Sequence, residues 1–288
     1  CIRDRIKIEG KKFDWFGLTQ ILKEHKGKLR QIRMLSVNEL KKKYKGAALG
    51  PLWALIKPTF TLFILWFAFE IGLKRNGGVH FINGKYTQFV FMLTGYVPWF
   101  YISECIVGGS RSIRSNKQFV TKLSFPVSNI MTFTSLSGLY IHILLCAIMY
   151  VVLLCLGFGP SIYNLQFIYY ALMMYFFFLV LSWMTAPLSA FSKDFENLIN
   201  SVITGLFWLS GIFWNTYDIS PLWLRKLMYF NPINYFVNGY RKSFLTDTFI
   251  FDSNYTTETI VFYAEFICMI FLGAHTYKKF RKILPDVL

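Results

Sequence analysis

Six long apolar stretches alternate with short polar or basic segments along this chain. Read in windows of about 19 residues, the hydropathy predicts six membrane-spanning helices. A spanning helix needs about 20 apolar residues, so the fifth stretch is short for a full crossing. The predicted spans cover residues 51–74, 87–108, 128–157, 165–190, 198–214 and 257–275. The pattern therefore predicts an all-α, polytopic membrane protein.

The most informative boundary is the point where a basic segment meets the first span. Residues 38–58, NELKKKYKGAALGPLWALIKP, turn through two glycines and a proline from lysine-rich into apolar sequence. This pattern predicts an amphipathic helix lying on the membrane surface. We therefore expect a basic N-terminal segment with an interface helix over 1–50, a transmembrane domain over 51–275 and a basic tail over 276–288.

Composition and charge support the membrane class and predict its orientation. Charged residues make up only 16% of the 288, whereas a soluble domain carries about 25%. The formal net charge of +16 could indicate nucleic acid, but the bases lie between the apolar stretches, where they face anionic lipid. On the predicted topology, 23 of the 31 Lys and Arg residues lie on one side. The positive-inside rule therefore places both termini in the cytoplasm.

Two segments outside the spans have helical patterns of their own. Residues 109–127 carry apolar side chains at 113, 120 and 123, which share one helical face, and Pro126 ends the element. Such a helix either lies on the membrane surface or fits a partner's groove. Residues 215–256 are apolar but broken by two prolines, so they form either a re-entrant hairpin that gates the outer mouth or an interfacial loop.

The sequence shows no catalytic chemistry. The phosphate-binding motif G-x-x-x-x-G-K-[ST] is absent, and so are HExxH, CxxC and GxSxG. The ionisable residues within the spans form no acid–histidine chain of the kind that a proton-coupled carrier uses. We expect no catalytic residue and no metal site in this chain, so any uphill transport takes its energy from a partner subunit or an ion gradient.

Aromatic residues are the other excess, with 31 Phe, 17 Tyr and 8 Trp. Many belong to lipid-interface belts, but two clusters lie inside the second and fifth spans. Aromatic faces stack weakly on the C–H surfaces of sugars, so these clusters are candidates for a sugar channel, with core packing as the alternative. The candidate channel residues are Tyr96, Trp99, Phe100, Trp208, Phe213 and Trp214.

In order and spacing, six segments resemble the membrane subunits of ATP-binding-cassette exporters for teichoic acids and lipid-linked polysaccharides, relatives of the O-antigen and capsule exporters. The likeness runs from about residue 30 to the tail. Two positions depart from the family pattern: Gly211, where proline is frequent, and Lys193, where arginine is usual. The segments are LSVNELKKKYKGAALGPLWALIKP (35–58), GYVPWFYISECIVGGSRSI (95–113), KLSFP (122–126), SKDFENLI (192–199), SGIFW (210–214) and NPINYFVNGYRKSFL (231–245).

The resemblance implies a homodimer with two copies of a separate ATPase subunit, which binds ATP and Mg²⁺, in the bacterial cytoplasmic membrane. The substrate it implies is a glycopolymer on undecaprenyl diphosphate. Coupling to the ATPase is expected through Arg111, Arg114, Phe119, Lys122, Phe125 and Asp194. The expected gate residues are Asn231, Pro232, Tyr235, Tyr240 and Arg241. Four basic residues are expected to attract the lipid diphosphate where it enters; alternatively, they only determine the membrane topology. They are Lys41, Lys42, Lys43 and Lys57.

Two other function classes stay open at this point. An ABC permease for a small drug or antibiotic shares the fold. A membrane-embedded transferase for polyprenyl-linked sugars would share the substrate, but it needs paired acids at a membrane boundary. Asp218, Asp247 and Asp252 are scattered in the sequence, which disfavours the transferase.

Overall fold

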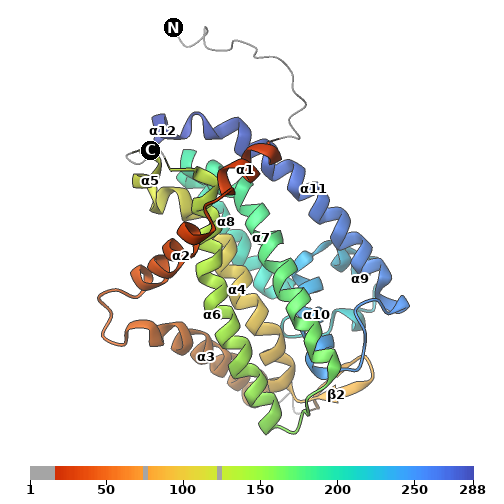
Figure 1. Cartoon of the computed structure of the whole chain (residues 1–288). Coiled ribbons are helices and arrows are strands. Elements are labelled where there is room, and N and C mark those ends of the chain that lie inside the picture. Colours follow the sequence, from red (N-terminus) through yellow and green to blue (C-terminus); the bar gives the residue numbers. More distant parts are fainter. Residues whose placement is uncertain (1–16, 74–76, 122–124) are drawn as a thin grey trace.

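The computed structural model describes residues 17–73, 77–121 and 125–288, and most of them are helical (Figure 1). Five helices are long and apolar enough to cross a membrane, and each overlaps one predicted span. The predicted all-α, polytopic fold is therefore confirmed. The five are Gly50–Gly72, Gln88–Ser115, Val127–Cys155, Ile162–Phe191 and Ser253–Arg281.

The fifth predicted span, 198–214, is corrected by the structure. It falls on α8 (Lys193–Leu209), which has 17 residues, too few for a straight crossing of about 30 Å of hydrocarbon. Three charged residues occupy the first turn of this helix, and the chain leaves the helical conformation at Ser210. Within the described residues, α8 is thus a partial crossing that ends in the SGIFW segment.

The elements follow one another with short connections. The first span consists of a 3-10 turn η2, helix α3 and a π-helical turn η3, and a small antiparallel hairpin that was not predicted follows it. The elements are α1 (Leu18–His25), α2 (Leu29–Lys43), η2 (Gly50–Leu52), α3 (Trp53–Trp66), η3 (Phe67–Gly72), β1 (Val79–Phe81), β2 (Gly84–Tyr86), α4 (Gln88–Ser115), α5 (Lys117–Thr121), α6 (Val127–Cys155), η4 (Ile162–Leu165), α7 (Gln166–Phe191), α8, η5 (Thr216–Asp218), α9 (Leu222–Leu227), η6 (Met228–Phe230), α10 (Pro232–Leu245), η7 (Ser253–Tyr255), α11 (Thr256–Arg281) and α12 (Leu284–Val287).

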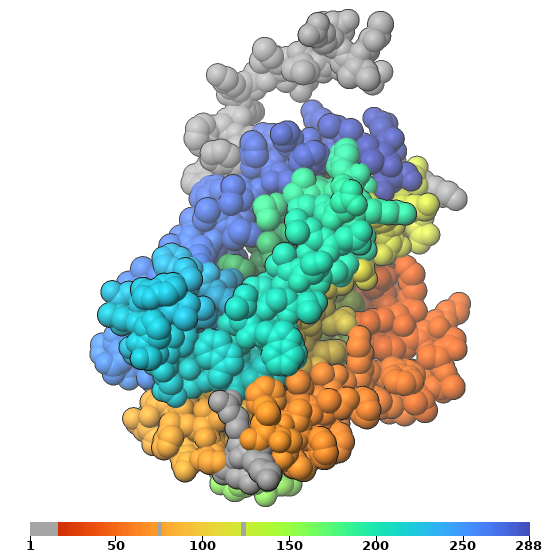
Figure 2. Space-filling view, turned by 180° about the vertical axis from the view of Figure 1, so that it is seen from behind, coloured from red at the N-terminus to blue at the C-terminus, as the bar shows by residue number. Residues whose placement is uncertain are grey.

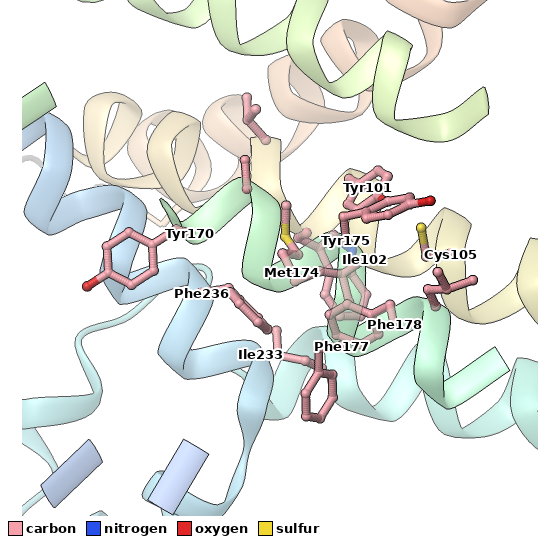
Figure 3. Packing of buried hydrophobic residues seen from close by; sticks show 14 of the residues in the cluster. Tyr101, Ile102, Cys105, Tyr170, Met174, Tyr175, Phe177, Phe178, Ile233 and Phe236 are labelled. Atoms are coloured by element: carbon pink, nitrogen blue, oxygen red, sulfur yellow. The ribbon is translucent and has the colours of Figure 1, made fainter. Parts of the chain in front are cut away.

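Helix α4 forms the centre of the bundle, with α6 and α7 packed against it. In the most apolar 18-residue stretch of α4, 72% of the residues are buried, whereas the same share is 17% in the first span and 17% in the span that contains α11. Rings and aliphatic side chains from α4, α7 and α10 interlock in this core (Figure 3). Close approach depends on small residues: a Cβ added at Gly109 would lie 3.0 Å from the Ser182 Cβ, and one at Gly239 would enter the Tyr170 ring.

The bundle has two distinct ends. At the terminal end lie α1, α5, α12 and the C-terminus; at the hairpin end lies the β1–β2 hairpin (Figure 1). Between α8 and α11 the chain folds into α9 and α10, and every α10 residue from Ile233 to Leu245 is buried. Because α10 packs against α4 and α7, α10 lies within the bundle, whereas α9 has no buried residue.

Candidate functional site

At the terminal end, a charged cluster joins the end of α4 to the start of α8. The Glu196 carboxylate accepts hydrogen bonds from Arg111 Nε at 2.6 Å and Arg114 Nη1 at 3.3 Å. Arg114 also donates to the carbonyl oxygens of Ser189 and Ala190 at the end of α7. Three helices thus meet at one carboxylate, which was not among the predicted coupling residues. Asp194, two residues earlier on α8, is exposed.

The predicted single element over 109–127 is wrong, because α4 continues without a break through Ser115. The Asn116 amide then donates to the Ser112 carbonyl oxygen, and α5 starts in a new direction. Phe119 contacts Phe125 and Phe133, with ring centroids 5.2 and 5.8 Å apart. The two aromatic residues predicted for coupling, Phe119 and Phe125, therefore lie together, but they are not part of the charged cluster of Arg111 and Glu196. Lys122 lies outside the described residues.

At the end of α2, the predicted basic residues are only partly brought together. Lys43 and Lys57 share a cavity of about 300 Å³ with Tyr44, Ala47, Trp53, Phe100 and Glu104, and Lys43 forms an ion pair with Glu104. Burial raises the pKa of Tyr44, so its hydroxyl stays protonated as a potential donor. Lys42 instead donates to the Asn116 side chain at 3.4 Å, and Lys41 is exposed on the last turn of α2.

The predicted channel aromatics form one connected row of rings. Phe207 contacts Tyr96 and Trp99 of α4, with ring centroids 6.5 and 5.4 Å apart, and also Phe213, at 4.9 Å. Phe213 in turn stacks on Phe69 at 5.4 Å. Tyr96, Trp99 and Phe213 are buried in the single chain, so they are packed and line no open lumen here.

Of the three other predicted channel residues, Trp208 and Trp214 extend this row at its edge. Trp208 is 54% exposed and contacts Phe207 at 5.3 Å. Trp214 donates its indole N–H to the Trp208 carbonyl oxygen at 3.3 Å. Phe100 lines the cavity of Lys43 and Lys57 instead. Since Phe100 follows Trp99 directly on α4, the basic cavity and the row of rings are adjacent.

The predicted gate residues belong to α10 and its cap. Asn231 is the N-cap: its Oδ1 accepts from Ile233 N and its Nδ2 donates to Ser210 Oγ, both at 3.0 Å. Pro232 occupies the first helical position, where no backbone N–H is needed. Tyr235 stacks on Phe262 at 4.2 Å. The start of α10 is thereby fixed to the SGIFW segment and to α11.

Arg241 is the most constrained of the gate residues. Its guanidinium is fully buried and donates to the carbonyl oxygens of Gly211 at 2.5 Å, Ile212 at 2.7 Å and Phe91 at 3.1 Å. It also lies 3.4 Å from the centroid of the Phe91 ring. Within the described residues no carboxylate pairs with it. Arg241 therefore ties α10 to α4 and to the break after α8 through backbone carbonyl oxygens.

Two further polar contacts around α10 were not predicted. Asn234 Oδ1 accepts the Gly211 N–H at 2.8 Å, and a Cβ at Gly211 would meet Thr216 Cγ2 at 2.5 Å. A proline at 211 would lose that hydrogen bond, because it has no backbone N–H. Lys242 pairs with Glu258 of α11 at 3.3 Å, with both side chains buried. Neither contact could be predicted, because Asn234 and Lys242 belong to no sequence pattern that indicates their partners.

These features define a multi-pass membrane protein in which a basic surface helix, a row of aromatic rings and the buried helix α10 surround a central helix. Residues 30–245, three quarters of the chain, match the model of the ABC-2 type transporter family, and the chain belongs to that family. It is 25% identical over 207 residues to the O-antigen export system permease protein RfbA of Myxococcus xanthus, covering 72% of this chain and 76% of the relative. A Klebsiella pneumoniae protein with the same description is 24% identical over 265 residues, 88% of this chain and 93% of the relative.

Proposed function

We propose that this chain is the membrane permease subunit of an ABC exporter of a lipid-linked polysaccharide, either wall teichoic acid on undecaprenyl diphosphate or a similar polymer. ABC-2 membership and the two relatives described as O-antigen permeases support a polysaccharide over a small drug. One observation carries the proposal: the cavity of Lys43 and Lys57 adjoins, through Phe100, the row of rings that leads along α4 toward the hairpin end.

The chemistry of this path matches the two parts of such a substrate. Ammonium groups at the cavity attract a diphosphate, and Tyr44 supplies a neutral donor beside them. Aromatic faces then offer weak, sequence-tolerant contacts to sugars, while the lipid tail stays in the bilayer. If both termini are cytoplasmic, as the positive-inside rule predicts from the basic residues, the basic cavity faces the side on which the polymer is made.

A second copy of the chain and an ATPase subunit complete the proposed transporter. The first span exposes large apolar side chains, including Phe60 at 62% and Phe63 at 53%, and α8 exposes Trp208 and Leu209. Pairing of these faces would place two rows of rings at one interface, where separation of the copies opens a channel. The ATPase subunit, which binds ATP and Mg²⁺, would dock at the terminal end against α5 and the Glu196 cluster.

The test is co-purification of the tagged chain with the ATPase encoded beside it, followed by reconstitution into liposomes with its lipid-linked glycan. We expect ATP-dependent movement of the glycan to the lumen, and a raised KM for it in Lys43→Gln/Lys57→Gln. Lys226→Gln, which removes an exposed cation from α9, is the matched control. Purification without any ATPase, or ATP-driven transport of a small drug and no glycan, would contradict the proposal.

Glu196→Gln is expected to reduce export per ATP hydrolysed. The substitution weakens both arginine contacts, which are partly exposed, so the loss is about 1 kcal/mol. This energy corresponds to about a fivefold change in the balance between joined and separated helices. The ratio of glycan moved to phosphate released measures it, with Ser201→Ala on the exposed side of α8 as control. An unchanged ratio would show that the cluster has no part in coupling.

A further inference from the structure

At the hairpin end, the β1–β2 hairpin and the SGIFW segment enclose a cavity of about 460 Å³. This volume lies within the range of small-molecule sites, roughly 300–1,000 Å³. Figure 2 shows the end of α8 lying directly above the first span and the hairpin on this face. The side chains that line the cavity are Val79, His80, Gln88, Phe213, Trp214, Asn215, Asp218 and Ile219.

Planar polar groups are held rigidly in this lining. Gln88, only 2% exposed, donates through Nε2 to the Phe213 carbonyl oxygen at 3.1 Å. Asn215 donates through Nδ2 to the His80 carbonyl oxygen at 2.9 Å and accepts from Tyr217 N at 3.1 Å. These bonds fix the start of α4 and the hairpin against the segment that follows α8. Asp218, by contrast, is an exposed carboxylate at the rim.

The aromatic part of the lining is the last member of the row of rings. Phe213 is held between Phe69, Phe207 and Trp208, with ring centroids at 5.4, 4.9 and 5.5 Å. Trp214 is half-buried beside it and is oriented by its bond to the Trp208 carbonyl oxygen. The cavity therefore lies where the proposed sugar path reaches the hairpin end.

A second cavity of about 260 Å³ shares Gly77, Gly78 and Gln88 with the first. Its lining adds Glu70, Lys85 and Tyr86, so charged and hydroxyl groups continue along the hairpin. Gly78 has φ +70° and lies against the Tyr86 carbonyl oxygen, where an added Cβ would come within 2.8 Å. Together the two cavities form one recess that combines polar side chains with an aromatic wall.

We propose that this recess binds saccharide units of the polymer as it leaves the permease. Sugars present apolar C–H faces and pairs of neighbouring hydroxyls, and the recess offers aromatic rings for the first and amide and carboxylate oxygens for the second. No cluster of metal-ligating side chains occurs among the described residues. The inference rests on the proposed function, because it takes the occupant to be the exported glycan.

Binding of the glycan without its lipid tests the site separately from export. The probe is the cell's own polymer, freed of lipid and diphosphate by mild acid, titrated against the purified complex with its ATPase subunit in the absence of nucleotide. We expect saturable binding that weakens about tenfold in Asp218→Asn, which loses charge-assisted hydrogen bonds, and further in Trp214→Leu. Asp252→Asn, a partly buried acid outside the recess whose side chain caps a turn in either form, should bind as the parent does.

Each outcome bears on one claim. No binding by the parent complex, or equal binding by the parent, Asp218→Asn and Trp214→Leu, overturns the recess as a saccharide site. Asp218 is exposed and its replacement is isosteric, so this comparison holds even if Trp214→Leu fails to fold. Export of the full lipid-linked glycan is measured on the same preparations. If the parent complex exports the glycan but does not bind the probe, only the saccharide site is refuted. If the parent complex does not export the glycan, the proposed function is refuted.

Discussion

Replacing Arg241 by methionine is expected to destabilise the protein by on the order of 3–5 kcal/mol. The change removes the donors for three buried carbonyl oxygens, those of Phe91, Gly211 and Ile212. Methionine fills a similar volume but donates no hydrogen bond, so the Gly211 and Ile212 oxygens would lose this buried donor, whereas the Phe91 oxygen still accepts from Thr94 Oγ1. The measurement is the thermal unfolding of the purified protein in detergent, followed by its export activity in liposomes.

Two further variants decide whether the loss comes from these hydrogen bonds. Arg241→Lys keeps the charge, but a single ammonium cannot reproduce a planar fork that reaches carbonyl oxygens on two segments, so we expect a loss nearly as large. Lys226→Met removes an exposed cation from α9 and should leave the unfolding temperature unchanged. A stable, active Arg241→Met protein would mean that α10 is held by its apolar packing alone.

Hydropathy predicted most of the fold because membrane crossing is a local property of the sequence. An apolar stretch of sufficient length has to be a helix in hydrocarbon, so five spans follow from residues 51–74, 87–108, 128–157, 165–190 and 257–275. The error at α8 has the same origin. The window averaged apolar residues from the helix and from the SGIFW segment, and it did not detect the break at Ser210.

The candidate site was less predictable because its contacts join residues far apart in the sequence. The aromatic clusters of the second and fifth spans were recognised separately, but their meeting through Phe207 depends on how α8 crosses α4. Glu196 and Lys242 carry no local pattern that marks their partners. Arg241 was selected by resemblance to a family, and its carbonyl partners could be found only from the structure.

Glu24→Gln is expected to release α1 from the bundle and to cost on the order of 3 kcal/mol of stability. The Glu24 carboxylate accepts from Ser128 Oγ at 2.5 Å, from Tyr277 OH at 2.6 Å and from Arg281 Nε at 3.0 Å. It is 8% exposed and joins α1 to the start of α6 and the end of α11. An amide carries no charge and offers one acceptor oxygen in place of two, so several donors would lose their partner.

The pH dependence identifies the carboxylate as the cause. Burial alone would raise the pKa of Glu24, but hydrogen bonds from Ser128, Tyr277 and Gln20 and the charge of Arg281 outweigh it, so the pKa lies below its ordinary value of 4.5. A carboxyl whose pKa is lowered by folding adds stability that is complete above the unfolded pKa and is lost as the pH falls through the folded one. The parent should therefore exceed Glu24→Gln in unfolding temperature at pH 7, and the difference should shrink below about pH 4.5.

Glu39→Gln provides the matched control for this series. Glu39 lies on α2 and pairs with Lys42 across 3.8 Å, where the lysine side chain is 55% exposed, so the pair contributes about 0–1 kcal/mol. Its unfolding temperature should follow that of the parent at every pH. If Glu24→Gln and Glu39→Gln shift the unfolding temperature equally, or if the Glu24→Gln difference persists unchanged into acid, then packing of α1 and not the buried carboxylate holds the N-terminal helix in place.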